Sequence, residues 1–127
     1  MQRSDQRAPL TRAMPVAAAA VLGYFAGTLP SADIASVLKA RAAGSERVDL
    51  RQQGTGNPGG LNAAKVLGTR WGLAVMATDF AKGTLASIVG RRIAGDAGAY
   101  LAGTGAVAGH CLPLWSRFRG GKGVATS

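Results

Sequence analysis

Three long apolar stretches, which charged residues almost entirely avoid, constrain the fold of this chain more than any other feature. A helix needs about 20 residues to cross the hydrocarbon core of a bilayer, and each stretch is close to that length or longer. Prolines within the first stretch predict a kink in its helix. We therefore expect an all-α, polytopic integral membrane protein with about three transmembrane helices, at 14–38, 71–89 and 97–115.

The composition agrees with helices that pack in lipid. Of the 127 residues, 47% are hydrophobic, but these are mostly Ala, Leu and Val, and only 6% of the chain is aromatic. Small residues, together with the 19 glycines, suit close helix packing in a membrane better than a large core in water.

The polar remainder divides the chain into a leader and a membrane domain. We expect residues 1–13 to be a disordered basic leader and residues 14–127 to form the membrane domain, with one polar loop at 39–69. The glycine- and proline-rich piece at 54–60 excludes a helix across the middle of that loop. A cleaved signal peptide is the alternative for the first stretch, because basic residues precede it and it contains a small-residue segment suited to cleavage.

The distribution of basic residues predicts an orientation. The chain carries 15 Lys and Arg against six Asp and Glu, a net charge of +9. Three basic residues lie in the leader and two at Arg91 and Arg92, whereas six lie in 39–70 and three in 117–122. The positive-inside rule then places the polar loop and the C-terminal tail in the cytoplasm and the N-terminus outside. Both glycine-rich loops are therefore expected to be cytoplasmic.

Asp79 and Lys82 are the exception to the separation of charged and apolar residues. Both lie inside the second apolar stretch, and residues three apart share one face of a helix. A charge at membrane depth is costly unless it is paired or lines a polar cavity. The two residues are either a structural ion pair that locks helices together or part of a polar site. If the stretch does not span a membrane, they are a solvated surface pair.

The chain offers few groups for nucleophilic or metal catalysis. It has one histidine, His110, and one cysteine, Cys111, so neither a metal-ligand cluster nor a Cys-His pair is expected. His110 lies in an apolar stretch, which favours a hydrogen-bonded packing residue, with a catalytic base as the alternative.

The tail from Phe118 to Ser127 is suited to binding phosphate. Its glycines let backbone N–H groups approach an anion, and Lys122 adds a positive charge. Gly121 and Lys122 are similar to the Gly-Lys pair of a nucleoside-triphosphate-binding loop, but Gly123 stands where that loop needs Ser or Thr. We therefore expect phosphate recognition without nucleotide hydrolysis.

Three segments follow one another along the chain as a set of motifs. They are Gly54-Thr55-Gly56-Asn57-Pro58-Gly59-Gly60-Leu61-Asn62 with Lys65 after it, Asp79-Phe80-Ala81-Lys82-Gly83, and Gly109-His110-x-x-Pro113 followed by Phe118-x-Gly120-Gly121-Lys122-Gly123-Val124-Ala125-Thr126. Together they resemble the motifs of the bacterial acyl-phosphate glycerol-3-phosphate acyltransferases, the PlsY family. The resemblance implies an enzyme of phospholipid synthesis that transfers an acyl group from an acyl phosphate to glycerol 3-phosphate, giving lysophosphatidic acid.

The same resemblance implies the roles of individual residues. The site would need no cofactor and no metal, and it would lie in a multi-pass protein of the bacterial inner membrane, in contact with lipid. The residues implied in catalysis are Thr55, Lys65 and Lys122. The residues implied in substrate binding are Gly54, Asn57, Asn62, Gly120, Gly121, Gly123 and Thr126. The residues implied in support of the site are Asp79, Lys82 and His110.

The chain departs from the family pattern in three ways. Thr55 stands where the family usually has serine, and Lys65 stands where it usually has arginine, which grips phosphate with two parallel hydrogen bonds. Gly60-Leu61 replaces the usual Ala-Thr, and the family continues past the tail with further spans and a third motif. The sequence therefore leaves open a fragment, a homologue that pairs with a second chain, or one that binds phosphate-bearing lipid precursors without turnover. A nucleic-acid-binding protein is disfavoured, because the basic residues are not interleaved with aromatic ones.

Overall fold

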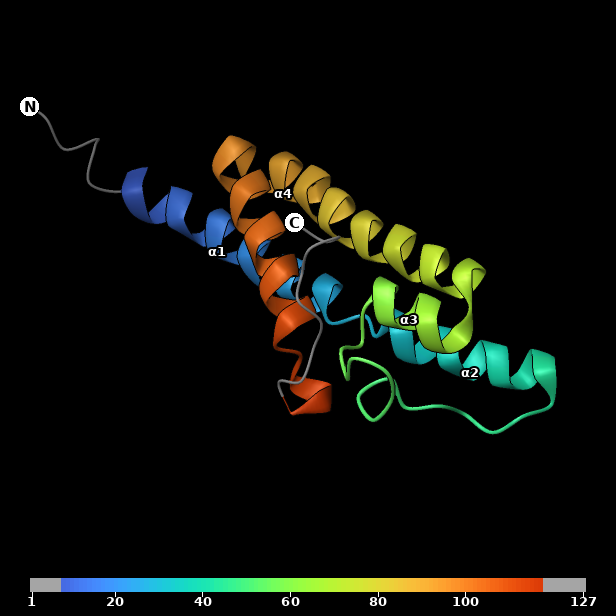
Figure 1. Ribbon diagram of the computed structural model, residues 1–127. Helices are drawn as coiled ribbons and strands as arrows, with labels where there is room; N and C mark the ends of the chain where they lie inside the picture. The colour runs from blue at the N-terminus through green and yellow to red at the C-terminus, as the bar shows by residue number, and fades with distance from the viewer. Residues whose placement is uncertain (1–7, 118–127) are drawn as a thin grey trace, which may run out of the picture.

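The computed structural model describes residues 8–117, and helices account for most of them (Figure 1). The α-helices are α1 (Ala8–Gly27), α2 (Ser31–Ala43), α3 (Gly60–Leu67) and α4 (Thr69–Cys111), and a short 3₁₀ helix follows at Leu114–Ser116. Within 8–117 the chain forms no strand, and the all-α prediction is confirmed.

The first apolar stretch forms two helices rather than the single kinked helix that we expected. α1 ends at Gly27 and α2 begins at Ser31, and Pro30 lies between them. Proline has no N–H to continue a helix, and its ring disfavours a helical backbone at the residue before it. α2 then continues to Ala43, beyond the predicted boundary at 38, and ends where Gly44 adopts a left-handed φ of 62°.

α1 also begins earlier than the sequence indicated. Its first residue is Ala8, so 8–13 is helical although we expected the leader to run to residue 13. Pro9 does not prevent this, because the first helical turn needs no internal N–H donors. Residues 1–7 of the leader lie outside the described part. At 20 residues, α1 is about 30 Å long, which matches the hydrocarbon core of a bilayer.

The second and third apolar stretches form two arms of α4 that fold back on each other. The arms meet at Ala94 and Gly95, whose backbone is not helical, and Gly95 has a φ of 64° that glycine adopts without strain. Beyond this turn the backbones approach closely, because a Cβ on Gly90 would lie 2.3 Å from the Gly98 carbonyl oxygen. The second arm ends at Cys111, earlier than the predicted boundary at 115.

α1 packs against the second arm of α4 through small residues. A Cβ on Gly23 would lie 2.0 Å from the carbonyl oxygen of Ala102, and one on Gly27 would lie equally close to that of Ala106. The residue of α1 with the higher number contacts the residue of α4 with the higher number, so α1 and this arm run parallel. Contacts between small residues are typical of helices that associate in membranes, where backbones can approach closely.

A second cluster of buried residues lies at the other end of the molecule. It joins α2, the following loop, α3 and the start of α4, and its members are Ala32, Ala35, Leu50, Ala63, Leu67 and Val75. α3 lies within the stretch that we expected to be a polar loop. It begins only at Gly60, and residues 54–59 form no helix, which agrees with the prediction for the glycine- and proline-rich piece.

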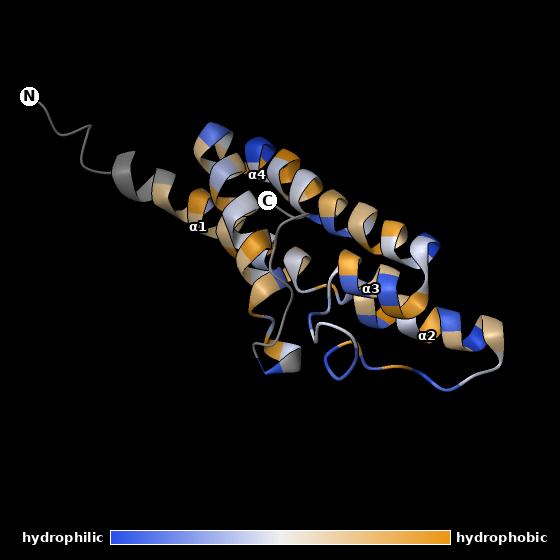
Figure 2. Cartoon of the chain, in the orientation of Figure 1, coloured by the Kyte–Doolittle hydropathy of each residue, from blue (hydrophilic) through white to orange (hydrophobic). Residues whose placement is uncertain are grey.

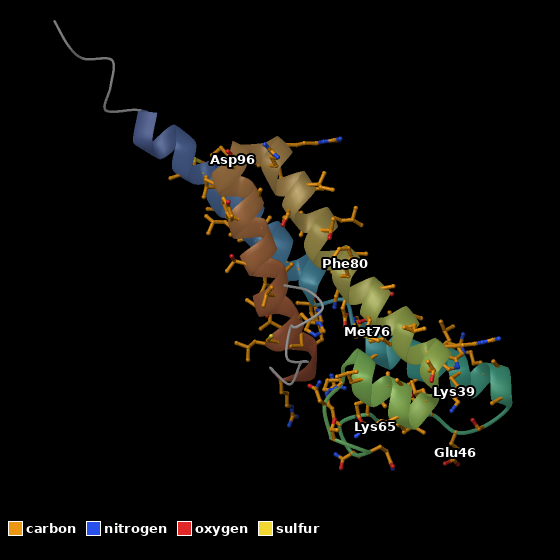
Figure 3. All side chains as sticks on the ribbon, turned by 45° about the horizontal axis from the view of Figure 1, so that its top comes forward. Lys39, Glu46, Lys65, Met76, Phe80 and Asp96 are labelled. Atoms are coloured by element: carbon orange, nitrogen blue, oxygen red, sulfur yellow. The ribbon has the colours of Figure 1, made fainter. Side chains whose placement is uncertain are left out.

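The outer surface is apolar along the long helices and polar at one end. Large hydrophobic side chains such as Phe80, Leu85 and Tyr100 are more than half exposed. Figure 2 shows hydrophobic and weakly polar residues along most of α1 and α4, and hydrophilic residues gathered in the loop between α2 and α3. Figure 3 shows Lys65 at that polar end and Asp96 at the opposite end. Two segments, Ala13–Ala43 and Thr69–Cys111, are long and apolar enough to cross a membrane.

Candidate functional site

The first glycine-rich loop is organised by a buried asparagine. Asn62, on α3, is only 1% exposed, and its side-chain amide donates hydrogen bonds to the carbonyl oxygens of Leu50 (2.9 Å) and Gln53 (3.0 Å). Its oxygen accepts a hydrogen bond from the backbone N–H of Thr55 at 2.9 Å. These three bonds tie both sides of the loop to one side chain and fix the backbone at Thr55.

Glycines let this loop close over Asn62. Gly54 and Gly56 have φ values of 55° and 76°, and a Cβ on Gly54 would lie 2.2 Å from the Asn62 oxygen. The side chain of Thr55 is exposed, and its hydroxyl oxygen accepts a hydrogen bond from the Asn57 N–H at 3.4 Å. Lys65 is also exposed, on α3. The loop therefore presents a hydroxyl and the adjoining helix presents a cation, the groups needed to bind a phosphate ester.

Two arginines and a serine fasten the loop to α2. Asp33 accepts hydrogen bonds from Arg47 at 3.1 Å and from Arg51 at 3.0 and 3.3 Å. Ser36, which is 2% exposed, donates its hydroxyl proton to the Val48 carbonyl oxygen and accepts from the Val48 N–H at 3.2 Å. These residues were not predicted from the sequence. The only signal was Asp33 itself, an acidic residue inside an apolar stretch.

Asp79 and Lys82 form a buried cluster with His110 and Ser31. Lys82 Nζ lies 2.9 Å from Asp79 Oδ1 and 3.0 Å from His110 Nδ1, and the Ser31 hydroxyl donates to the same Asp79 oxygen. The exposed fractions of Asp79, Lys82 and His110 are 2%, 6% and 8%. This burial rules out a solvated surface pair and agrees with a pair that locks helices together.

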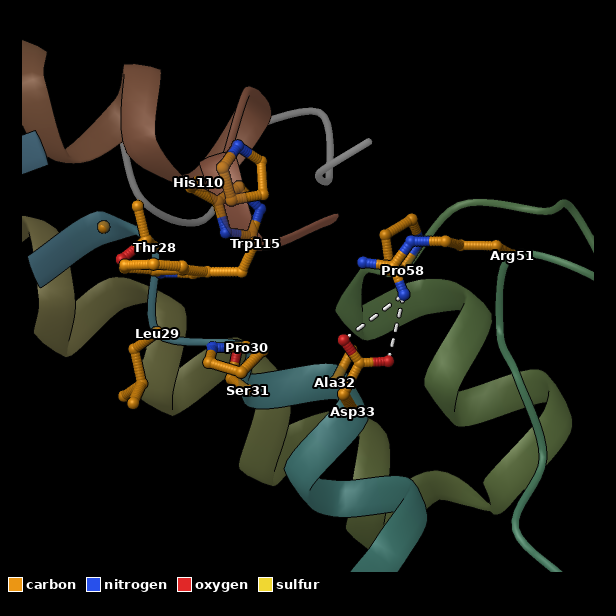
Figure 4. A pocket seen from close by; sticks show the side chains of 12 residues that line it. Thr28, Leu29, Pro30, Ser31, Ala32, Asp33, Arg51, Pro58, His110 and Trp115 are labelled. Atoms are coloured by element: carbon orange, nitrogen blue, oxygen red, sulfur yellow. Dashed lines mark hydrogen bonds and ion pairs between the residues drawn. The ribbon is translucent and has the colours of Figure 1, made fainter. Parts of the chain in front are cut away.

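The cluster and the loop meet at a cavity of about 140 Å³ (Figure 4). One wall is the segment between α1 and α2, another comes from the loop, and a third from the end of α4 and the residues after it. Its lining residues are Gly27, Thr28, Leu29, Pro30, Ser31, Ala32, Asp33, Arg51, Pro58, His110, Pro113 and Trp115. Arg51 and His110 thus line one space.

An apolar groove of about 580 Å³ shares part of this wall. It extends along α1 and the first arm of α4, and its lining residues are Phe25, Ala26, Thr28, Leu29, Pro30, Thr78, Ala81, Lys82, Leu85 and Trp115. A cavity with Arg51 and His110 in its wall, beside an apolar groove, is suited to a ligand that has a charged end and a hydrocarbon end.

The sequence singled out three groups of residues, and in two of these groups the structure places the members close to one another. Gly54, Thr55, Asn57 and Asn62 lie in or under one loop, with Lys65 on the next helix, and Asp79, Lys82 and His110 form one cluster. The tail residues Gly120, Gly121, Lys122, Gly123 and Thr126 lie outside the described residues.

Comparisons with known proteins point to one family. The family model described as glycerol-3-phosphate acyltransferase matches residues 17–127. Among relatives of the same description, one from Symbiobacterium thermophilum is 41% identical over 108 residues, which are 85% of this chain and 51% of the relative. One from Bacillus subtilis is 40% identical over 114 residues, which are 90% of this chain and 56% of the relative.

Two solved structures are also similar. Both are crystal structures of PlsY (YgiH), an integral membrane glycerol 3-phosphate acyltransferase, one in its glycerol 3-phosphate form and one in its lysophosphatidic acid form. The first has a TM-score of 0.65 and 33% identity over 91% of this chain and 54% of that chain, and the second has a TM-score of 0.62 and 30% identity. The chain spans about half the length of the relatives it matches.

Proposed function

This chain belongs to the glycerol-3-phosphate acyltransferase family, and on that premise we propose that it takes part in acyl transfer from an acyl phosphate to glycerol 3-phosphate. The observation that carries the proposal is the family match over 17–127, because that range includes both glycine-rich segments and the Asp79–Lys82 pair. The glycerol 3-phosphate and lysophosphatidic acid forms of the similar crystal structures support the same substrate and product for this chain.

The proposed reaction needs positioning and charge stabilisation more than a nucleophilic side chain. The 1-hydroxyl oxygen of glycerol 3-phosphate attacks the carbonyl carbon of the acyl group. The single bond between this carbon and the bridging oxygen of the phosphate breaks, and inorganic phosphate leaves with the electron pair. The hydroxyl proton is taken up by the departing phosphate or by solvent. Because an acyl phosphate is already activated, the protein has to hold two anions close together and stabilise the charge that develops on them.

We assign the residues to these tasks as follows. Thr55 and Lys65 bind glycerol 3-phosphate, with Gly54 and Asn57 shaping the same loop. Asn62 acts as a positioning residue, because all of its described hydrogen bonds go to the loop backbone. Lys122 binds the acyl phosphate together with the tail residues Gly120, Gly121, Gly123 and Thr126. The hydrocarbon chain of the donor lies in the apolar groove beside the cavity.

The chain is an integral membrane protein, and we propose that its polar end faces the cytoplasm. The loop between α2 and α3 and the 3₁₀ helix after α4 lie at one end of the described structure, with the turn between the two arms of α4 at the other (Figure 1). More basic residues lie at the first end, and such residues are retained on the cytoplasmic side. The substrates and lipid are the proposed partners, with a second polypeptide segment or chain completing the site.

A binding protein without turnover is the second candidate function. It is favoured by Thr55 and Lys65 in place of the family's usual serine and arginine, since a lysine cannot form the two parallel hydrogen bonds that arginine makes to phosphate.

One experiment separates the two candidates. The purified full chain in detergent is given radiolabelled acyl phosphate and glycerol 3-phosphate, and the labelled lipid is counted. Turnover that falls by about tenfold or more in Lys122→Ala, as expected for a lost charged contact to phosphate, supports catalysis. Arg70→Ala removes an exposed cation from the same end and is the matched control.

Equilibrium dialysis with labelled glycerol 3-phosphate completes the experiment. Binding without turnover supports the second candidate. If the chain neither binds glycerol 3-phosphate nor forms lipid, both candidates are wrong for the chain by itself.

A further inference from the structure

The end of α1 has more carbonyl groups than its own chain can satisfy. A helix leaves its last four C=O groups without helical partners, and buried ones must find other donors. Here the carbonyl oxygens of Tyr24 and Phe25 accept from the Thr28 N–H at 3.1 and 3.2 Å, and that of Ala26 accepts from the Leu29 N–H at 3.4 Å. Pro30 has no N–H, and the Ser31 N–H donates to the carbonyl oxygen of Leu29 at 2.9 Å, so the carbonyl of Gly27 needs a donor from elsewhere.

Lys82 supplies that donor from the first arm of α4. Its ammonium group donates to the carbonyl oxygens of Gly27 at 3.2 Å and Leu29 at 2.9 Å. A positive charge at this position also interacts favourably with the negative end of the α1 dipole. The lysine therefore caps the C-terminus of a helix that lies more than 50 residues away along the chain.

Asp79 makes the complementary contact on the other side of the break between α1 and α2, residues 28–30. Its Oδ1 accepts a hydrogen bond from the hydroxyl of Ser31, the first residue of α2, where the helix dipole favours a negative charge. The ion pair thus has its cation at the end of one helix and its anion at the start of the next.

Lys82 also determines how His110 is used. His110 Nδ1 lies 3.0 Å from Lys82 Nζ and 3.5 Å from Asp79 Oδ1. An ammonium group can only donate hydrogen bonds, so the shorter contact, to Nζ, favours Nδ1 as an acceptor. In that tautomer the ring proton lies on Nε2, and His110 is one of the residues that line the cavity.

We propose that Asp79 and Lys82 are a positioning pair that clamps the break between α1 and α2 and holds His110 as a hydrogen-bond donor to the ligand in the adjoining cavity. The clamp is a property of the fold, and only the identity of the ligand rests on the proposed function. An anionic or hydroxyl oxygen is the partner that an Nε2–H donor recognises.

The clamp makes a different prediction from an ordinary ion pair. Removing both charges of a buried ion pair together is often neutral. The variant Asp79→Asn/Lys82→Met also leaves no unpaired charge, and its asparagine keeps an acceptor for Ser31. It still deprives the Gly27 carbonyl of its donor, so the clamp predicts that the break loosens.

Hydrogen–deuterium exchange of the full chain in detergent tests the clamp. We expect the amides of 28–34 to exchange about tenfold faster in the double variant and in Lys82→Met, with Lys82→Arg close to the parent because a guanidinium also donates to carbonyls. Arg91→Met/Asp96→Asn, which removes an exposed pair 3.3 Å apart, is the matched control and should leave this segment unchanged. Parent-like exchange in the double variant overturns the clamp.

The single histidine of the chain makes the second measurement simple. In protein with ¹⁵N-labelled histidine, one pair of ring nitrogen signals reports the tautomer without further assignment. We expect an unprotonated Nδ1 in the parent and a changed tautomer population in Lys82→Met. A protonated Nδ1 in the parent overturns the role given to His110. Neither measurement requires turnover, so the clamp can hold even where acyl transfer is not found.

Discussion

Replacing Gly109 by alanine tests the close packing of α1 against α4. A Cβ at this position would lie 1.9 Å from the carbonyl oxygen of Tyr24 and 3.1 Å from the backbone nitrogen of Thr28. Real Cβ atoms essentially never come closer than 3.0 Å to such an atom, so the helices must separate by about 1.1 Å. The obstructing atoms belong to the backbone and cannot rotate away.

The expected loss of stability follows from two opposing effects. Overpacking of this kind costs about 1–3 kcal/mol, and a backbone obstruction belongs at the upper end of that range. Alanine recovers about 1 kcal/mol over glycine through its higher helix propensity. We therefore expect Gly109→Ala to lower the free energy of unfolding by about 2 kcal/mol.

Unfolding in mixed micelles with increasing SDS, followed by circular dichroism, measures this loss. Gly103→Ala on the same arm is the matched control, because its Cβ would meet only the side chain of Ser87, whose hydroxyl oxygen at 2.6 Å can turn aside. The control should be as stable as the parent or up to about 1 kcal/mol more stable. If Gly109→Ala unfolds at the same SDS fraction as Gly103→Ala, the inferred backbone contact is wrong.

Two further predictions concern the glycine-rich loop. Asn62→Ala should leave two carbonyls and one N–H of the loop without their partner, at about 1–3 kcal/mol for each group that stays buried, so trypsin should cleave after Arg51 several-fold faster. Unchanged cleavage would show that the asparagine does not hold the loop. Asp33→Asn should weaken the contacts to Arg47 and Arg51, but these are partly exposed, so we expect less than about 1 kcal/mol. A larger drop in the free energy of unfolding, measured by the same SDS titration, would contradict a merely fastening role.

The sequence identified the long helices well because hydropathy and turn residues act locally. The stretches 71–89 and 97–115 correspond to the two arms of α4, and Gly95 provides the turn between them. The division of the first stretch was not predicted, because Pro30 alone is compatible with either a kink or a break. The donor that satisfies the broken end is Lys82, and nothing in the local sequence identifies it.

The candidate site was predictable as motifs but not as a geometry. Thr55 and Asn62 were recognised as one motif, yet only the structure shows that Asn62 lies beneath the loop and Thr55 on its surface. Asp33 and Arg51 were missed because their contact joins α2 to a loop whose path depends on tertiary packing. The spacing of Asp79 and Lys82 along the chain predicted that they pair. Their contacts with Ser31 and His110 were not predictable, because they depend on how three helical segments meet.

The break in the first apolar stretch and the buried ion pair depend on each other. Irregular backbone at membrane depth is tolerated only where protein groups satisfy its N–H and C=O groups. Charged side chains there are tolerated only where they have polar partners. Lys82 finds its partners in the carbonyls that the break exposes, and Asp79 finds one in the hydroxyl with which α2 begins. Each feature supplies polar partners to the other, which explains why the charges in the second apolar stretch lie beside the interruption in the first.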